Sequence, residues 1–460
     1  MQGYVFNERL EPAKRPVMER IKNFNEIYEL YDQEEAQVQS ERCIQCGDPY
    51  CHNKCPLHNF IPQWLKSTAA RDLSLSFALS NESSPFPEIM GRVCPQDRLC
   101  EGACTLNDGH GAITIGSIET FISEEGFKAG LKPTFHAVKN GKKVAVIGSG
   151  PAGLSAATFL LRNGLSVTMF ERANRAGGLL TYGIPSFKLD KSVVARRVEW
   201  LIEAGMELKC GVTVGQDISF DELVASYDAL FLGIGATKSN SSGLLHEDAE
   251  NVFMAIDFLT AIQKKLFGEA SDAKYDVKGK NVVVIGGGDT AMDCLRTSIR
   301  EGARSVRCLY RRDAANMPGS RKEYKNAIEE GAEFIFNVAP KALVVDENGH
   351  VVMVKMVKTE LGEPDEKGRR RIVEVAGSEF DVEADVVIMA LGFSPETPSF
   401  LAQSGIVFNS WGGIVVDARG MTSRPGVFAG GDAVRGADLV VNAAYDGREV
   451  AANIAAYLGV

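Results

Sequence analysis

Clustered cysteines are the residues of this chain whose spacing says most about chemistry. Seven of the ten lie in one region: Cys43, Cys46, Cys51, Cys55, Cys94, Cys100 and Cys104. Such crowding in a chain without a secretion signal indicates metal ligation rather than disulfides. The first four have the spacing C-x2-C-x4-C-x3-C-P, which resembles the bacterial ferredoxin pattern, in which the last cysteine ligates a different cluster from the others. The spacing therefore predicts two interleaved iron–sulfur clusters.

The cysteine count is one short of two complete clusters. Two four-iron clusters need eight protein ligands, and the region supplies seven cysteines. Either one cluster lacks an iron, or one ligand is an oxygen or nitrogen donor. Glu119 is a candidate for that donor, and the other candidates are His52, His58 and His110. Zinc is the alternative metal, because Cys-x2-Cys pairs commonly bind it, although zinc sites favour two such pairs and this region has one.

A glycine-rich turn further along the chain indicates that a dinucleotide binds there. Gly148, Gly150 and Gly153 follow a short apolar strand and precede an apolar helix. This G-x-G-x-x-G arrangement places free backbone N–H groups of the helix N-terminus on a pyrophosphate. The next strand, Ser166–Phe170, ends in Glu171, whose carboxylate is placed to accept hydrogen bonds from both ribose hydroxyls.

A second unit of the same kind occurs at Gly279–Asp293, where GKNVVVIGGGDTAMD repeats GKKVAVIGSGPAGLS. Ala291 takes the place of the third glycine, which the pattern permits. The second strand of this unit ends in Arg311 and Arg312, where the first unit has an acid. Arginine at this point pairs with a 2′-phosphate or stacks on adenine, so the second ligand is predicted to be NADP rather than NAD. A solvated arginine surface is the alternative interpretation.

Weaker patterns place further elements around these turns. After the first unit, RAGGLLTYGIPSFKLDK bends sharply and suits backbone lying against a flat ring system, and a helix is expected at Val193–Ala204. The apolar runs Ala229–Gly235 and Ala384–Gly392 are interpreted as two crossings between a first domain and a second one inserted in it. Residues 341–383 alternate like a hairpin with a charged tip at Asp365–Arg371.

The C-terminal region supplies a further polar group. Asp432 follows two glycines and can hold a ribityl or phosphate oxygen. A helix from about Leu439 onward would direct its positive N-terminus into the cleft, which suits an anionic reduced flavin. The three remaining cysteines are expected to pack in helices or strands, and they are Cys210, Cys294 and Cys308.

Composition restricts the classes of partner. The chain has 460 residues, 45% hydrophobic and 24% charged, with a net charge of -10. This length suits about three domains of roughly 150 residues. The negative charge argues against nucleic acid as a partner. No apolar run approaches the ~20 residues of a membrane span, and the first residues lack the basic and apolar blocks of a signal peptide. We therefore expect a cytoplasmic protein.

These patterns together predict the fold class α/β, with two Rossmann-like dinucleotide-binding domains, one inserted in the other, preceded by a mainly helical two-cluster iron–sulfur domain. Helical patterns at Asn23–Gln39 and Phe60–Ser80 support the helical part. The expected boundaries are residues 1–140 for the iron–sulfur domain, 141–240 with 385–460 for the outer domain, and 241–384 for the inserted domain.

The motifs resemble one known family over nearly the whole chain. GSGPAGLSAA with Glu171, the inner GGGDTA and the closing AGGDAVRG look like a flavoprotein with two dinucleotide sites. The cysteine region, ERCIQCGDPYCHNKCP with GRVCPQDRLCEGACTLN and IGSIE, is similar to the small (beta) subunit of bacterial NADPH-dependent glutamate synthase. The resemblance implies FAD in the outer domain, NADPH in the inserted domain and two 4Fe-4S clusters.

The resemblance also assigns site residues by position. One cluster would be held by Cys43, Cys46, Cys51 and Cys104, and the other by Cys55, Cys94, Cys100 and Glu119. FAD contacts would be Gly148, Gly150, Pro151, Ala152, Gly153, Glu171, Gly178, Leu179, Gly431 and Asp432. NADPH contacts would be Gly286, Gly288, Asp289, Thr290, Arg311 and Arg312. Related pyrimidine dehydrogenases have glutamine at the Glu119 position, which supports an eighth ligand that is not a thiolate.

The resemblance implies an electron-input subunit. NADPH would give a hydride to FAD, and single electrons would pass through the clusters to the FMN of a large (alpha) subunit that makes L-glutamate from L-glutamine and 2-oxoglutarate. No catalytic side chain is expected, because the cofactors carry the chemistry. The alternatives are the large subunit of a ferredoxin-linked NADPH transhydrogenase, a thioredoxin-reductase-type enzyme and a non-enzymatic cluster scaffold. A thioredoxin-reductase-type enzyme would need a redox-active cysteine pair, and the cysteines outside the cluster region form no C-x-x-C.

Overall fold

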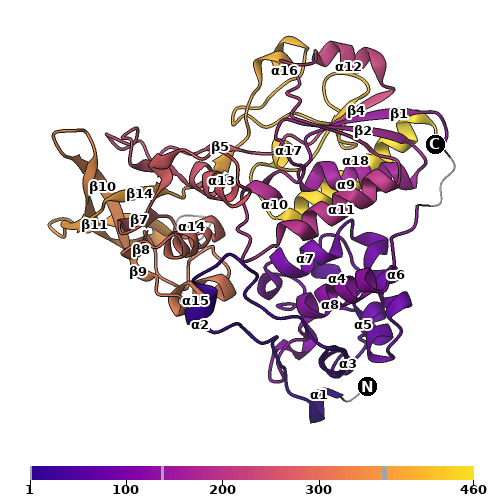
Figure 1. The fold of residues 1–460 in the computed structure, drawn as a ribbon, viewed down its shortest axis with the longest axis horizontal. Coiled ribbons are helices and arrows are strands. Elements are labelled where there is room, and N and C mark those ends of the chain that lie inside the picture. Colours follow the sequence, from indigo (N-terminus) through magenta and orange to yellow (C-terminus); the bar gives the residue numbers. More distant parts are fainter. Residues whose placement is uncertain (1–2, 136–138, 365–369) are drawn as a thin grey trace.

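The computed structural model describes residues 3–135, 139–364 and 370–460, arranged as a helical N-terminal part and two α/β parts (Figure 1). The helices of the N-terminal part are α1 (Gly3–Phe6), α2 (Val17–Arg20), α3 (Gln33–Glu41), α4 (Tyr50–Lys54), α5 (Ile61–Ala69), α6 (Leu73–Ser83), α7 (Pro87–Val93) and α8 (Ile115–Lys128), with single turns at Gln96–Arg98 and Thr105–Asn107. The expected helix at Asn23–Gln39 is only half formed. It begins at Gln33, because Asp32 and Glu35 form a capping box there.

A five-stranded parallel sheet forms the outer domain, in the order β16-β4-β1-β2-β3. Its strands are β1 (Lys143–Ile147), β2 (Ser166–Glu171), β3 (Glu207–Cys210), β4 (Ala229–Leu232) and β16 (Val427–Ala429). Its helices are α9 (Pro151–Arg162), α10 (Leu179–Tyr182), α11 (Lys191–Glu203), α12 (Phe220–Ser226), α16 (Ser399–Gln403), α17 (Asp432–Arg435) and α18 (Val440–Leu458). Helices α9 and α18 pack side by side against one face of the sheet (Figure 1).

The inserted domain repeats this architecture with the sheet order β6-β14-β7-β8-β9. The parallel strands are β6 (Val252–Met254), β7 (Asn281–Ile285), β8 (Ser305–Tyr310), β9 (Glu333–Phe336) and β14 (Val386–Met389), and the helices are α13 (Ala255–Leu266), α14 (Asp289–Arg300) and α15 (Arg321–Glu329). Antiparallel strands β10 (Val338–Val345), β11 (Val351–Pro364), β12 (Arg370–Glu374) and β13 (Phe380–Glu383) include the expected hairpin. Most of its expected charged tip lies outside the described residues.

The two α/β domains are joined by a short ribbon in which β5 (Lys238–Ser239) pairs with β15 (Phe393–Ser394). The expected boundary at residue 385 is therefore placed too early. Strand β14 pairs with β7 and β6, so it belongs to the sheet of the inserted domain. The apolar runs that contain β4 and β14 are equivalent strands of the two domains, and the chain crosses between domains just after each of them.

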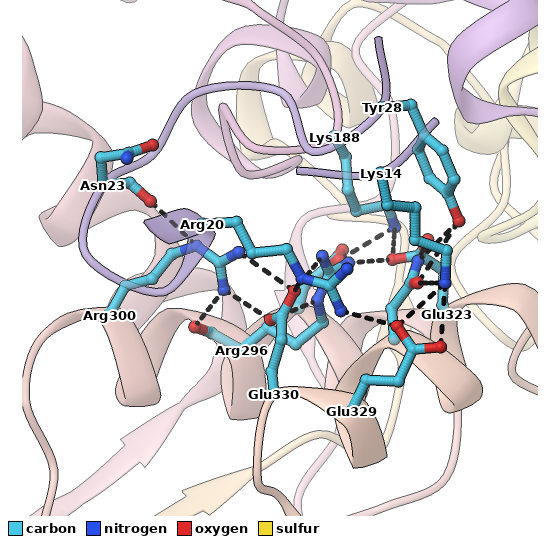
Figure 2. A network of polar contacts seen from close by, with 12 residues as sticks. Lys14, Arg20, Asn23, Tyr28, Lys188, Arg296, Arg300, Glu323, Glu329 and Glu330 are labelled. Atoms are coloured by element: carbon cyan, nitrogen blue, oxygen red, sulfur yellow. Dashed lines mark hydrogen bonds and ion pairs between the residues drawn. The ribbon is translucent and has the colours of Figure 1, made fainter. Parts of the chain in front are cut away.

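A buried ionic network ties an N-terminal arm, residues 14–28, to the inserted domain (Figure 2). Glu330 accepts hydrogen bonds from Arg296 at 2.9 Å and from Arg300 at 2.6 Å. Arg20 of the arm reaches the same carboxylate at 3.0 Å. If the arm moved away from α14 and α15, these buried charges would lose their partners, which is energetically costly. The network therefore holds the arm against both helices.

The outer domain enters the same network through two consecutive residues. The Phe187 ring contacts two guanidinium groups, and its centroid lies 4.3 Å from that of Arg296 and 4.0 Å from that of Arg300. Lys188 donates a hydrogen bond to Asp293 of α14 at 2.9 Å. The arm, the outer domain and the inserted domain therefore meet at one polar cluster, which fixes the orientation of the two α/β domains.

Candidate functional site: two dinucleotide turns and two cysteine-lined cavities

Each glycine of the first turn meets a different physical requirement. Gly148 has φ +95°, and a Cβ there would lie 2.4 Å from the carbonyl oxygen of Gly233. A Cβ on Gly150 would meet open space, whereas one on Gly153 would lie 2.0 Å from the Gly148 carbonyl oxygen. Gly148 and Gly153 are therefore needed for the turn and for close packing, and Gly150 leaves room at the N-terminus of α9 for a phosphate.

Glu171 lies buried at the end of β2, beside this turn. Its Oε2 accepts hydrogen bonds from the backbone N–H and the hydroxyl of Ser149, and its Oε1 accepts one from the Ala173 N–H at 2.8 Å. The carboxylate thus orders the turn, and its remaining lone pairs are available to ribose hydroxyls. The sequence pattern had no signal for Ser149 as the partner of Glu171.

Segments distant in the sequence converge on the N-terminus of α9. A Cβ on Gly178, which precedes Leu179 of α10, would lie 2.9 Å from the Cα of Gly150. A Cβ on Gly431 would lie 2.7 Å from the Cβ of Ala152. Together with Pro151, the first residue of α9, these residues form one cradle from the turn, the glycine-rich loop and the C-terminal segment.

Asp432 adds an unsatisfied polar atom to the cradle. Its Oδ1 is buried and has no hydrogen-bond partner among the described residues. Burial raises the pKa of this carboxyl to about 7. An orphaned buried acceptor is costly unless a ligand supplies a donor, so the group fits a cofactor that carries hydroxyls, such as the ribityl chain of FAD.

The second turn has matching geometry. Gly286 has φ +139°, and a Cβ there would lie 2.2 Å from the Ala390 carbonyl oxygen, while a Cβ on Gly288 would meet open space. The half-buried Thr290 follows in the first turn of α14. The carboxylate of Asp289 accepts a hydrogen bond from the Ser320 N–H at 2.8 Å. This carboxylate therefore also holds the loop that follows β8.

The two predicted phosphate-binding arginines lie at the end of β8. Arg311 is exposed, and its backbone carbonyl accepts a hydrogen bond from the hydroxyl of Thr359 at 3.0 Å. The Nε of Arg312 is buried and has no hydrogen-bond partner among the described residues. An exposed guanidinium next to a partly buried donor fits a bound phosphate group.

The clustered cysteines separate into two cavities. The first is lined by Cys55, Cys94, Cys100 and Glu119. The second is lined by Cys43, Cys46, Cys51 and Cys104. Ile115 lines both cavities, and Val441, in the first turn of α18, also lines the first. The structure thus brings together the same two sets of four side chains that the resemblance implies, and one set borders the outer domain.

Glu119 is the one candidate for the eighth ligand that lines a described cavity. It lies on α8, where its Oε1 accepts a hydrogen bond from Asn59 at 2.8 Å. Burial, with a further contribution from Glu88, raises the pKa of Glu119 to about 8. The alternatives point elsewhere, because the rings of His52 and His58 contact each other and that of His110 packs on Tyr4.

The thiols of both cavities are free and fit a metal cluster. Burial raises the pKa of Cys43 to about 11 and that of Cys51 to about 12. The pKa values of Cys94 and Cys100 lie well above the ordinary value for the same reason. Such thiols stay protonated unless a cation stabilises the thiolate, which is the role of iron in a cluster. Among described residues no three His, Cys, Asp or Glu side chains are placed to hold a single ion.

Comparison with known proteins identifies the family. The model of dihydropyrimidine dehydrogenase domain II, 4Fe-4S cluster, matches residues 20–131, and that of pyridine nucleotide-disulphide oxidoreductase matches residues 142–447. The glutamate synthase [NADPH] small chain of Escherichia coli (strain K12) is 51% identical, over 98% of this chain and 98% of that one. The chain belongs to the glutamate synthase small-chain family. It is an oxidoreductase of the pyridine nucleotide type with an iron–sulfur domain.

Further similarities extend beyond the glutamate synthase small-chain family. The putative oxidoreductase AegA of Escherichia coli (strain K12) is 50% identical over 98% of this chain and 70% of its own length. FprA from Mycobacterium tuberculosis has a TM-score of 0.59 at 19% identity, over 69% of this chain and 85% of that one. The similarity to FprA is a likeness of fold alone, and it agrees with the predicted α/β class.

Other features of this family member follow from the described residues. Cys210 lies on β3, Cys294 on α14 and Cys308 on β8. Cys294 and Cys308 are buried as expected, whereas Cys210 is half-buried. No described helix combines the length and the apolar composition that crossing a membrane requires.

Sequence reasoning missed Arg98, which contacts the second turn, and Lys188, which links the two α/β domains. Arg98 lies in the cysteine motif GRVCPQDRLCEGACTLN and Lys188 in the glycine-rich segment RAGGLLTYGIPSFKLDK, but neither pattern carries a signal for a contact with another domain.

Proposed function

We propose that this chain is the electron-input subunit of a glutamate synthase. NADPH would be oxidised here, and the electrons would reach the FMN of a large (alpha) subunit that makes L-glutamate from L-glutamine and 2-oxoglutarate. When bound, FAD supplies two-electron acceptance and the two 4Fe-4S clusters supply one-electron acceptance. The proposal is carried by one observation, that two dinucleotide turns and two four-ligand cavities occur in one chain.

The residues of the two turns would bind and orient the nucleotides. The open spaces at Gly150 and Gly288 leave the N-termini of α9 and α14 accessible to a pyrophosphate. Asp432 would accept a hydrogen bond from a hydroxyl of FAD, and Arg311 and Arg312 would contact the 2′-phosphate that distinguishes NADPH from NADH. The buried network around Lys188 would hold the two domains in one orientation, which favours hydride transfer by positioning the reactants.

The placement of the cysteine cavities suits electron exit from the outer domain. The cavity of Cys55, Cys94, Cys100 and Glu119 borders Val441 of α18. Ile115 separates it from the cavity of Cys43, Cys46, Cys51 and Cys104. Two ligand sets adjacent to each other, one beside the outer domain, would let single electrons leave that domain. Seven thiolate ligands also favour the cytoplasm as the compartment, because they must stay reduced.

Rapid mixing of the reconstituted protein with NADPH tests the proposal. The full-length chain would be loaded anaerobically with FAD, iron and sulfide, and then mixed with NADPH or with NADH. We expect NADPH to bleach the flavin absorbance faster than NADH does, followed by electron paramagnetic resonance signals of reduced clusters. A protein that binds neither flavin nor iron, or that NADPH leaves oxidised, would contradict the proposal.

The similarity to AegA, a putative oxidoreductase, shows that chains of this kind are not confined to glutamate synthase small chains. The second candidate function is therefore a subunit of another oxidoreductase, such as the ferredoxin-linked NADPH transhydrogenase. Purification of the native complex distinguishes between the two candidate functions. A large subunit that consumes glutamine supports glutamate synthase, and a small flavin subunit in its place supports the transhydrogenase.

A further inference from the structure

Arg98 extends from the cluster domain to the dinucleotide turn of the inserted domain. Its Nη1 donates a hydrogen bond to the carbonyl oxygen of Pro318 at 2.8 Å. Its Nη2 lies 3.5 Å from Oδ2 of Asp289, the residue that follows Gly288 and begins α14. The Arg98 side chain is 45% exposed, so part of the guanidinium faces solvent beside the turn.

Asp289 explains why a cation is needed at this place. The N-terminus of a helix favours anions, and a phosphate bound there would be repelled by a carboxylate on the first residue of the helix. The outer domain has uncharged Pro151 at the equivalent position. The turn of the inserted domain thus carries a negative charge that the outer turn lacks, and Arg98 supplies a compensating positive charge from another domain.

The segment that carries Arg98 is held firmly by the backbone. The carbonyl oxygen of Gln96 accepts hydrogen bonds from the N–H groups of Leu99, Glu101 and Gly102 at 3.0–3.1 Å. The Gln96 side chain donates to the Gly91 carbonyl oxygen at 2.9 Å. The Arg98 backbone is therefore ordered before any ligand arrives, and binding would cost little additional conformational entropy.

We propose that Arg98 is a binding residue for the pyrophosphate of NADPH, supplied by the cluster domain to the inserted domain. Arg98 neutralises Asp289 and presents the free part of its guanidinium to the phosphate oxygens. This inference rests on the proposed function, because it takes the second turn as the NADPH site. It adds a contact to the part of the nucleotide that NADPH and NADH share.

Calorimetric titration of the full-length, FAD-loaded protein with NADP⁺ and NAD⁺ tests the role of Arg98. We expect Arg98→Ala to weaken binding of both nucleotides by a similar factor of about ten or more, since a charge-assisted hydrogen bond is lost. Arg304→Ala is the matched control, because it removes an exposed arginine that precedes β8, at the opposite end of that strand from Arg311. The control should bind both nucleotides as the wild type does.

Three outcomes would bear on the proposal in different ways. Equal affinities of Arg98→Ala and wild type would overturn it, and so would a loss confined to NADP⁺, since that would place Arg98 at the 2′-phosphate. Failure of the wild-type protein to bind either nucleotide would contradict the proposed function itself. Arg98→Lys, which keeps the charge, should recover part of the affinity for both nucleotides and so separate charge from folding defects.

Discussion

Lys188 of the outer domain and Asp293 of the inserted domain form an ion pair at 2.9 Å, with only 13% and 8% of their side chains exposed. Glu323 lies 3.6 Å from the same ammonium group. The pair crosses the boundary between the two dinucleotide-binding domains. It therefore contributes both to stability and to the relative position of the two turns.

Replacing Lys188 with methionine should destabilise the protein by about 3 kcal/mol, because Asp293 would be left as a buried charge without its partner. The free energy of unfolding, measured by chemical denaturation, checks this. In the double variant Lys188→Met/Asp293→Leu, which removes both charges of the pair, most of the loss should be recovered. A double variant as unstable as the single one would show that the ion pair is not the cause.

The acid stability of the protein should depend on Glu323. Burial by itself raises the pKa of this carboxyl, but Lys188 and Arg296 outweigh burial and lower the pKa to about 2, from an ordinary 4.5. The folded state therefore favours the ionised form, and the resulting stabilisation is complete above about pH 4.5 and is lost as the pH falls towards 2.

Glu323→Gln tests this dependence. At neutral pH we expect the variant to be about 3 kcal/mol less stable, because two buried cations lose a partner. The difference from wild type should shrink as the pH falls from about 4.5 towards 2, which denaturation curves at a series of pH values would measure. A difference that stays constant with pH would mean that Glu323 does not titrate in this window.

Glu119→Ala should remove one cluster. If Glu119 is the eighth ligand, the cavity of Cys55, Cys94 and Cys100 keeps only three donors, and iron content should fall by about half. Glu119→Gln, which keeps an oxygen donor, should retain more iron. Glu124→Gln is the control on the same helix, since Glu124 pairs with Arg196 and does not line the cavity. Unchanged iron content and spectra in Glu119→Ala would assign the ligand elsewhere.

Reversing the charge of Arg311 should change nucleotide preference. In Arg311→Glu, a carboxylate would repel the 2′-phosphate, so binding of NADPH should weaken about tenfold more than binding of NADH. Arg304→Glu, an equal charge reversal at the opposite end of β8, should leave the preference unchanged. Equal losses for the two nucleotides in Arg311→Glu would refute the phosphate assignment. Dissociation constants from flavin fluorescence would provide the comparison.

Expectations based on contiguous patterns agree well with the structure. Strand β8 ends directly before Arg311 as predicted, and helix α11 begins two residues before the predicted start and ends one residue before the predicted end. Both patterns extend over several residues whose periodicity is local. The expected helix at Asn23–Gln39 was wrong in its first half, because backbone groups there pair with other segments: the Ile27 N–H donates to the Phe187 carbonyl oxygen at 3.3 Å and the Glu29 N–H to that of Ala13 at 2.9 Å.

The sequence by itself determined the chemical inventory, because each part of it depends on a short local pattern. A turn such as Gly148–Gly153 needs only neighbouring residues, and the spacing of Cys43, Cys46, Cys51 and Cys55 is a property of one segment. Only the tertiary structure decided that β14 belongs to the inserted domain and that Arg98 reaches Asp289. Those relationships join residues far apart in the chain, and they arise from the packing of whole domains, which no local pattern encodes.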